Sequence, residues 1–191
     1  MVVSVDLLLL SAIGGYLFGY WLVFVSGLYG VDQKPADIER CFWAVLLCTI
    51  GLGLNIGADV QKTTTLQLQD GLITSGYYAR TRNPNYLGEI FIFFSFGILS
   101  SSFISWIYLL AAWIIVFGSG MMKKEISLMQ KEGYKEYKQK SLILLPRISP
   151  DYWTNYKIYG GIFAVIALIY FVGGFLYIFG IKSPRKTYEL Y

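Results

Sequence analysis

Apolar segments separated by polar stretches constrain the fold of this chain more than any other feature. Their approximate bounds are Leu7–Tyr29, Cys41–Gly57, Tyr86–Ser100, Phe103–Met122 and Ile158–Gly180, of which the third is short. A transmembrane helix needs about 20 apolar residues, and the bilayer core leaves no other partner for its backbone groups. The sequence therefore predicts an all-α, polytopic transmembrane helical bundle of about five spans.

The composition supports a membrane protein. Hydrophobic residues make up 55% of the chain and charged residues only 15%, whereas soluble domains average roughly 25% charged residues. The 16 Tyr, 5 Trp and 13 Phe residues suit aromatic belts at both membrane interfaces. The first apolar segment is too long for a cleavable signal peptide and lacks a basic leader, so we expect it to be a span.

The polar segments give the expected topology. Only Ser100-Ser101-Ser102 separates the third span from the fourth, which predicts a tight hairpin. Eleven of the 16 basic residues lie in Asp59–Asn85 and Lys123–Lys157. The positive-inside rule places both segments on one side, the cytosol or the mitochondrial matrix. We expect N-terminal helices at 1–58, a core of loop, hairpin and amphipathic segment at 59–147, and a C-terminal span and tail at 148–191.

Histidine is absent, which excludes histidine-based acid–base chemistry and histidine-ligated metals or haem. Cys41 and Cys48 are seven residues apart in one apolar segment. On a helix this spacing separates them by roughly 10 Å, beyond the reach of a disulfide, so we interpret them as packing residues. No zinc or iron–sulfur spacing is present, and we expect no metal.

The corner that runs from Arg82 to Glu89 is the strongest candidate site. It is a polar, rigid segment that leads directly into the third span, so Glu89 is expected one helical turn inside the membrane. Ionisable groups at that depth are costly and mark function by default. Pro84 favours an extended residue before it, and Asn85 is expected to cap the third span. We expect Glu89 to lie beside Arg82 or Lys124.

Three further polar residues are candidates. Asn55 and Asp59 are four residues apart and share one face at the end of the second span, where they suit an amide or a ribose hydroxyl. Glu125 stands where the fourth span emerges. We expect Asn85 and Glu89 to contact Asp59 or Glu125 in one polar cluster. The alternative is a structural role for these residues. Asn55 and Asp59 would hydrogen-bond the carbonyls at a helix end, the arginines would anchor the chain at the membrane interface, and the segment after Lys123 would be an amphipathic helix on the membrane surface.

Residues Asn55 to Pro146 resemble a superfamily of membrane enzymes. It comprises isoprenylcysteine carboxyl methyltransferases, phospholipid methyltransferases and the C-terminal domain of steroid 5-alpha-reductases. The blocks Ala58-Asp59-Val60-Gln61-Lys62, Gly76-Tyr77-Tyr78 and Arg82-Asn83-Pro84-Asn85-Tyr86-Leu87-Gly88-Glu89 are similar to the reductase branch. The blocks Lys124-Glu125-Ile126-Ser127-Leu128, Gly133-Tyr134 and Leu145-Pro146 are similar to the tail shared with the methyltransferases.

The resemblance implies roles for seven residues. Arg82, Glu89 and Glu125 would be catalytic, and Asn55, Asp59, Asn85 and Tyr86 would bind the cofactor. The chain departs from the family pattern at two of these blocks: Asn83 replaces the histidine of Arg-His-Pro, and Lys124 replaces the first of two acidic residues. Each lost charge-assisted hydrogen bond is worth roughly 1.5–3 kcal/mol, so we expect weaker cofactor binding than in intact members.

Three functions remain open. The first is a methyltransferase that transfers a methyl group from S-adenosylmethionine to a lipid or a prenylated substrate. The second is an NADPH-dependent reductase of a steroid or enone lipid. The third is a non-catalytic subunit of a larger membrane assembly that binds no cofactor. We expect membrane lipids and other membrane subunits, rather than nucleic acids, as partners, in the endoplasmic reticulum or the mitochondrial inner membrane.

Overall fold

The computed structural model describes residues 38–100 and 103–172. These residues form the helices α2 (Ile38–Leu68), η1 (Gly76–Tyr78), α3 (Pro84–Ser100), α4 (Phe103–Ala112), η2 (Trp113–Gly118), α5 (Ser119–Met129), α6 (Tyr134–Lys140) and α7 (Tyr152–Val172). Within the described ranges the chain forms no strand apart from one isolated bridge. The predicted all-α fold is confirmed.

Two of the described helices are long and apolar enough to cross a membrane. They are α2 and the continuous helical stretch Ser105–Met129, and they indicate membrane association. The expected first span, Leu7–Tyr29, and the last residues of the expected fifth span lie outside the described residues. The expected third span corresponds to α3, which has 17 residues.

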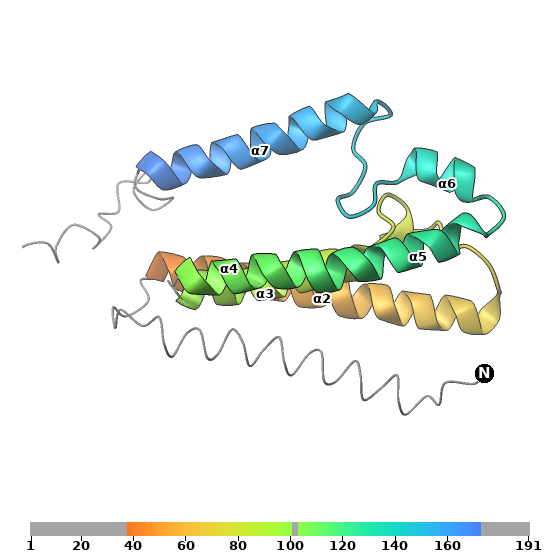
Figure 1. Cartoon of the computed structure of the whole chain (residues 1–191), viewed down its shortest axis with the longest axis horizontal. Helices are drawn as coiled ribbons and strands as arrows, with labels where there is room; N and C mark the ends of the chain where they lie inside the picture. Colours follow the sequence, from red (N-terminus) through yellow and green to blue (C-terminus); the bar gives the residue numbers. More distant parts are fainter. Residues whose placement is uncertain (1–37, 101–102, 173–191) are drawn as a thin grey trace, which may run out of the picture.

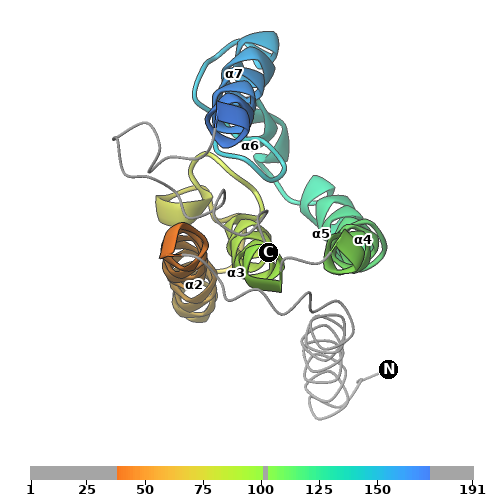
Figure 2. The ribbon, with the colours of Figure 1, turned by 90° about the vertical axis from the view of Figure 1, so that its left-hand side faces the viewer.

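Helices α2 and α3 share the most extensive packing in the fold and lie side by side (Figures 1 and 2). Two glycines permit this approach. A Cβ atom on Gly88 would lie 2.6 Å from the Gly51 carbonyl oxygen and 2.6 Å from the Asn55 amide nitrogen. Such distances are far inside van der Waals contact, so only glycine fits at this crossing. By contrast, a Cβ atom on Gly53 would meet open space.

Helices α4, η2 and α5 form one continuous rod beside α3 (Figures 1 and 2). Since α3 ends at Ser100 and α4 begins at Phe103, the two form the predicted hairpin. Phe93, Leu109 and Phe117 form the buried core between them. The η2 segment is a π-helix, an irregularity that is frequent at functional sites.

The polar segments gather at one end of this bundle, and they are more helical than expected. Helix α2 continues to Leu68, well past the expected boundary at Gly57. The segment after Lys123, expected as one helix, is divided into α5 and α6, because Gly133 adopts a left-handed φ of 76°. A parallel bridge joins Thr81 to Leu142 and ties the two polar segments together.

Helix α7 lies apart from the bundle of α2 to α5 (Figures 1 and 2). Its first turn is fixed by Asn155, which is 1% exposed. The Asn155 side chain accepts hydrogen bonds from the backbone of Ile148 and Ser149 at 2.8 Å each, and it donates to the carbonyls of Ser149 and Asp151. This amide therefore sets the angle at which the chain enters α7.

Candidate functional site

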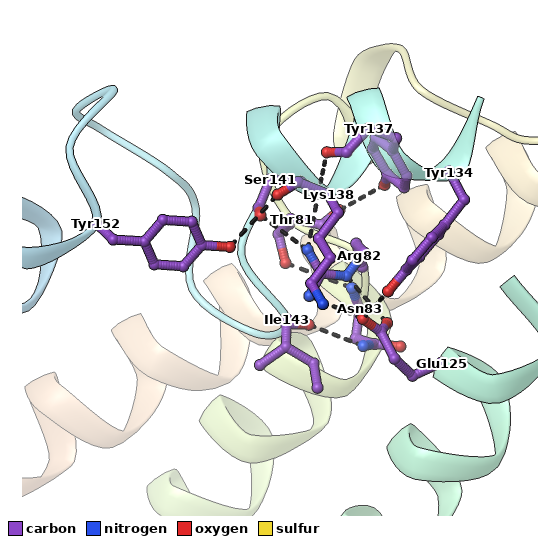
Figure 3. Close-up of polar contacts among 10 residues, drawn as sticks. All are labelled: Thr81, Arg82, Asn83, Glu125, Tyr134, Tyr137, Lys138, Ser141, Ile143 and Tyr152. Atoms are coloured by element: carbon purple, nitrogen blue, oxygen red, sulfur yellow. Dashed lines mark hydrogen bonds and ion pairs between the residues drawn. The ribbon is translucent and has the colours of Figure 1, made fainter. Parts of the chain in front are cut away.

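Arg82 and Glu125 form a two-pronged ion pair at the polar end of the bundle (Figure 3). The Arg82 Nε and Nη2 atoms each lie 3.0 Å from a Glu125 carboxylate oxygen. The two side chains are only 5% and 16% exposed. The planar guanidinium group of Arg82 matches a carboxylate in geometry. Its ion pair with Glu125 joins the start of α3 to α5.

The same two side chains are held by residues of α6 and the segment after it. Tyr134 donates a hydrogen bond of 2.5 Å to Glu125. Arg82 Nη1 donates to the Ser141 carbonyl oxygen at 2.8 Å and to its hydroxyl at 3.1 Å. We name this group, Arg82, Glu125, Tyr134 and Ser141, the interlock. Every polar atom described here has a partner within the chain.

Backbone pairing around Arg82 completes the connection. The Arg82 amide donates to the Leu142 carbonyl at 2.9 Å, and Thr81 Oγ1 donates to the Leu144 carbonyl at 2.7 Å. Asn83, which is fully buried, donates to the Ile143 carbonyl at 2.8 Å. The residue at the position of the resembled superfamily's histidine therefore joins this connection through its amide nitrogen, while its Oδ1 atom is buried without a hydrogen-bond partner among the described residues. The interlock fixes the corner against the chain that follows α6 (Figure 3).

Burial raises the pKa of three tyrosines in this region. The pKa of Tyr78 rises to about 12, with a further contribution from the charge of Asp59. Burial, together with the hydrogen bond to Glu125, raises the pKa of Tyr134 to about 12. The pKa of Tyr137 is also raised by burial, and its hydroxyl donates to the carbonyls of Tyr78 and Thr81 at 2.7 and 3.2 Å. All three phenols are held in the neutral, donating form.

A second polar group lies at the crossing of α2 and α3. The Asn55 amide donates to a Glu89 carboxylate oxygen and to the Asn85 carbonyl, both at 3.3 Å. Glu89 is 8% exposed, and Asn85 Oδ1 is buried with no hydrogen-bond partner among the described residues. We name Asn55, Asn85 and Glu89 the crossing cluster. It brings together three of the seven predicted site residues.

Glu89 and Glu125 contact different predicted residues. Glu89 was expected beside Arg82 or Lys124, and in contact with Asp59 or Glu125; it accepts a hydrogen bond from Asn55, while Glu125 pairs with Arg82. The cap assignment was wrong: α3 begins at Pro84, so Asn85 lies in its first turn rather than before it.

The two remaining predicted residues border the crossing cluster. Tyr86 packs on the buried core, with its ring centroid 5.7 Å from that of Phe117. Asp59 lies one turn beyond Asn55 on α2 and is exposed. Its charge acts on Tyr78, Tyr86 and Lys124, which places it at the rim of the same region.

Lys124 is the residue whose environment sequence reasoning missed. Its Nζ atom is buried and has no hydrogen-bond partner in the described part of the chain. It lies 5.4 Å from the centroid of the Tyr78 ring and 5.9 Å from that of Tyr86. The signal in the sequence is the departure itself, a lysine at a position where the resembled superfamily has an acidic residue.

A cavity of about 490 Å³ opens on the far side of Tyr137, between residues 72–79 and α6. None of the seven predicted site residues lines it; its walls are Leu72, Thr74, Ala79, Glu132, Gly133, Glu136, Tyr137 and Lys140. Among the described residues, no group of three or more acidic, cysteine or histidine side chains could hold a metal ion.

The comparison with protein families gives one match. The family described as "Protein of unknown function (DUF1295)" matches residues 28–141, more than half of the chain. The chain belongs to this family. The DUF1295 match includes the corner, the crossing cluster, Lys124 and the whole interlock. No curated protein and no solved structure matches the chain.

Proposed function

We propose that this DUF1295 protein is a membrane methyltransferase that transfers a methyl group from S-adenosylmethionine to a lipid-like substrate. One observation carries the proposal: the crossing cluster brings a buried carboxylate, Glu89, and an unpartnered acceptor, Asn85 Oδ1, to one place at the start of α3. Buried acceptors are costly unless a donor satisfies them. The ammonium and ribose hydroxyls of S-adenosylmethionine are such donors.

The surroundings of the crossing cluster suit a cationic cofactor. The exposed carboxylate of Asp59 stands one turn from Asn55, and the ring of Tyr86 lies beside the cluster on α3. Aromatic faces attract cations within about 6 Å, and a sulfonium is a cation. These side chains would hold and orient S-adenosylmethionine.

Methyl transfer from S-adenosylmethionine then requires mainly that the protein position the substrate nucleophile against the methyl carbon. A nucleophilic oxygen, nitrogen or carbon of the substrate attacks the methyl carbon, and the carbon–sulfur bond breaks with its electron pair passing to sulfur. The products are S-adenosylhomocysteine and the methylated substrate, and a proton leaves the substrate if it was bound to the nucleophile. Arg82 and Glu125 satisfy one another, so in this proposal they are positioning residues that fix α3 against α5.

A lipid-like substrate is supported by an aromatic pair formed between α3 and η2. Phe94 stacks on Trp113 with ring centroids 5.9 Å apart, and the Trp113 indole nitrogen is buried without a hydrogen-bond partner among the described residues. An indole N–H needs an acceptor when it is buried, which a carbonyl or hydroxyl on an apolar ligand can supply. The resemblance to methyltransferases of prenylated and phospholipid substrates points the same way.

A second candidate is a non-catalytic subunit of a membrane assembly. The observation that favours it is the interlock. The resemblance implies that Arg82 and Glu125 are catalytic, but both side chains bind partners within the chain. A protein retained only as a scaffold would keep such a connection and lose its cofactor contacts.

The test is binding and transfer by the full chain purified in detergent or nanodiscs. Calorimetry measures the affinity for S-adenosylmethionine and for NADPH, and labelled methyl transfer to membrane lipid extracts measures activity. We expect weak but measurable S-adenosylmethionine binding, reduced about tenfold or more in Asn85→Ala and Glu89→Gln. Asp70→Asn, on the exposed loop after α2, is the matched control.

The alternatives give different results in the same experiment. Binding of NADPH without S-adenosylmethionine would identify a reductase. Binding of neither cofactor, with the protein recovered in a stable complex with other membrane subunits, would identify the scaffold.

A further inference from the structure

We propose that Lys124 is an anion-binding position, at which its ammonium group receives a carboxylate or phosphate oxygen of the small ligand. The proposal deepens the proposed function by naming a group on the cofactor, and it rests on that function only for the source of the anion.

The ammonium group of Lys124 is buried without a hydrogen-bond partner among the described residues. The Nζ atom of Lys124 has no exposed surface to hydrate it. A buried ammonium group is costly unless it is paired or neutralised. Lysine side chains are rarely buried without a partner, so an unpaired one inside a candidate site calls for a ligand.

The ammonium group of Lys124 lies between two aromatic rings of other elements. Lys124 comes from α5, and its ammonium group faces Tyr78 on η1 and Tyr86 on α3, at 5.4 and 5.9 Å from the ring centroids. These distances are at the outer limit of a cation–π contact, about 6 Å. The two rings form walls beside the charge. Neither tyrosine accepts a hydrogen bond from the Lys124 ammonium group.

Charges of both signs surround Lys124. The charged groups that act on Lys124 are Lys62, Asp59 and Glu125, of which Glu125 is already paired with Arg82. The crossing cluster adds Glu89, one helix away on α3. A ligand that carries both a cation and an anion can place its cation near these carboxylates and its anion at Lys124.

The amino-acid portion of S-adenosylmethionine is such a ligand, because it carries an ammonium and a carboxylate on one carbon. A nucleotide phosphate offers the same oxygen chemistry to Lys124. The shared ligand group is therefore an oxyanion, and the experiment has one arm for each source.

The test uses calorimetry on the full chain with three probes. S-adenosylhomocysteine carries the carboxylate, 5′-methylthioadenosine lacks the whole amino-acid portion, and 2′,5′-ADP carries phosphates. Lys124→Met removes the charge and keeps most of the chain length, Lys124→Arg keeps a cation, and Lys123→Met is the control at the exposed neighbour. We expect Lys124→Met to weaken S-adenosylhomocysteine binding about 10–100-fold, the range of one charge-assisted hydrogen bond.

In the same experiment, Lys123→Met and the wild type should bind S-adenosylhomocysteine with the same affinity, and Lys124→Arg should retain much of that affinity. All variants should bind 5′-methylthioadenosine equally, because it lacks the carboxylate. If 2′,5′-ADP is the probe that depends on Lys124, the anion position stands and methyl transfer is overturned. If S-adenosylhomocysteine binds the wild type and Lys124→Met equally, the anion position is overturned and the proposed function stands. If no probe binds the wild type, the anion position is also overturned.

A second measurement covers the case in which Lys124→Met does not fold. Amine-selective labelling of the wild type, followed by peptide mass spectrometry, compares Lys124 with Lys123. Slower labelling of Lys124 when S-adenosylhomocysteine or 2′,5′-ADP is added, with Lys123 unchanged, supports the proposal. Labelling of Lys124 that neither ligand alters contradicts it.

Discussion

Arg82 and Lys124 bring two positive charges into the same end of the helical bundle, yet the structure treats them differently. All three guanidinium nitrogens of Arg82 donate to Glu125 or Ser141. The ammonium group of Lys124 has no hydrogen-bond partner among the described residues. The interlock is therefore complete without a ligand, whereas the region around Lys124 and the crossing cluster retains buried atoms for which residues 38–100 and 103–172 supply no partner.

This difference separates residues that stabilise the fold from residues that are available to bind a ligand. Buried polar atoms in native proteins are almost always satisfied, so unsatisfied ones indicate either strain or a missing partner. Asn85 Oδ1 and Lys124 Nζ are an acceptor and a donor of this kind, both close to Tyr86. We therefore expect substitutions in the interlock to lower stability, and substitutions in the crossing cluster to lower ligand affinity.

The largest effect is expected from Arg82→Met. It leaves Glu125 charged, largely buried and without its ion pair, a loss that typically costs about 3–5 kcal/mol. Chemical or thermal unfolding in detergent measures the change in the free energy of unfolding. Arg80→Met, at an exposed neighbouring side chain, should change it by less than about 0.5 kcal/mol. Equal unfolding midpoints for the two variants would show that the interlock is not structural.

Tyr134→Phe should have the next largest effect. It removes the hydrogen bond of 2.5 Å to Glu125 while keeping the ring, and a hydrogen bond to a charged group contributes about 1.5–3 kcal/mol. The matched control is Tyr152→Phe, because the Tyr152 hydroxyl is exposed and its hydrogen bond to the Lys138 carbonyl is 3.4 Å long. The same unfolding measurement applies, and a larger loss in the control would contradict the comparison.

Gly88→Ala tests whether the close packing of α2 and α3 positions the crossing cluster. The added methyl group would lie 2.6 Å from backbone atoms of α2, so the helices must separate, at a typical cost of about 1–3 kcal/mol. Gly53→Ala, which meets open space on α2, is the control. We expect Gly88→Ala also to weaken ligand binding. If it leaves both stability and binding unchanged, the close crossing does not position the cluster.

The smallest effect is a dependence on alkaline pH. The pKa values of Tyr78 and Tyr134 are about 12 in the folded chain, against 10.0 for an unperturbed tyrosine, and that of Tyr137 is also raised. Their contribution to the free energy of unfolding is fully present below pH 10.0 and is lost as the pH rises to about 12. Unfolding followed by tyrosinate absorbance measures this loss, and Tyr137→Phe should make it smaller. A free energy of unfolding that stays constant over this window would contradict the assignment.

The helices could be predicted because their signal is local. Apolar length and polar breaks located α2 to α5, although α2 extends to Leu68, where polar residues continue a helix that the apolar pattern no longer marks. The division between α5 and α6 was missed because it depends on the left-handed conformation of Gly133, which a glycine permits but does not require.

The candidate residues could be named from the sequence, but their partners could not. Arg82 and Glu125 are 43 residues apart, and Asn55 and Glu89 are 34 residues apart. Which carboxylate pairs with which amide or guanidinium depends on how α2, α3 and α5 pack, and the spacing along the chain contains no such information. The isolation of the Lys124 amine is likewise a property of the packed elements around it.

The bridge between Thr81 and Leu142 has a consequence for the biosynthesis of the protein. Residues 80–83 form backbone and side-chain hydrogen bonds to residues 141–147, which the ribosome makes only after the whole hairpin of α3 to α5. Because chains are synthesised from the N-terminus, the hairpin is made while its base is still open. The segment that follows α6 then closes the base, so a nascent chain that stops before Leu142 cannot make the connection.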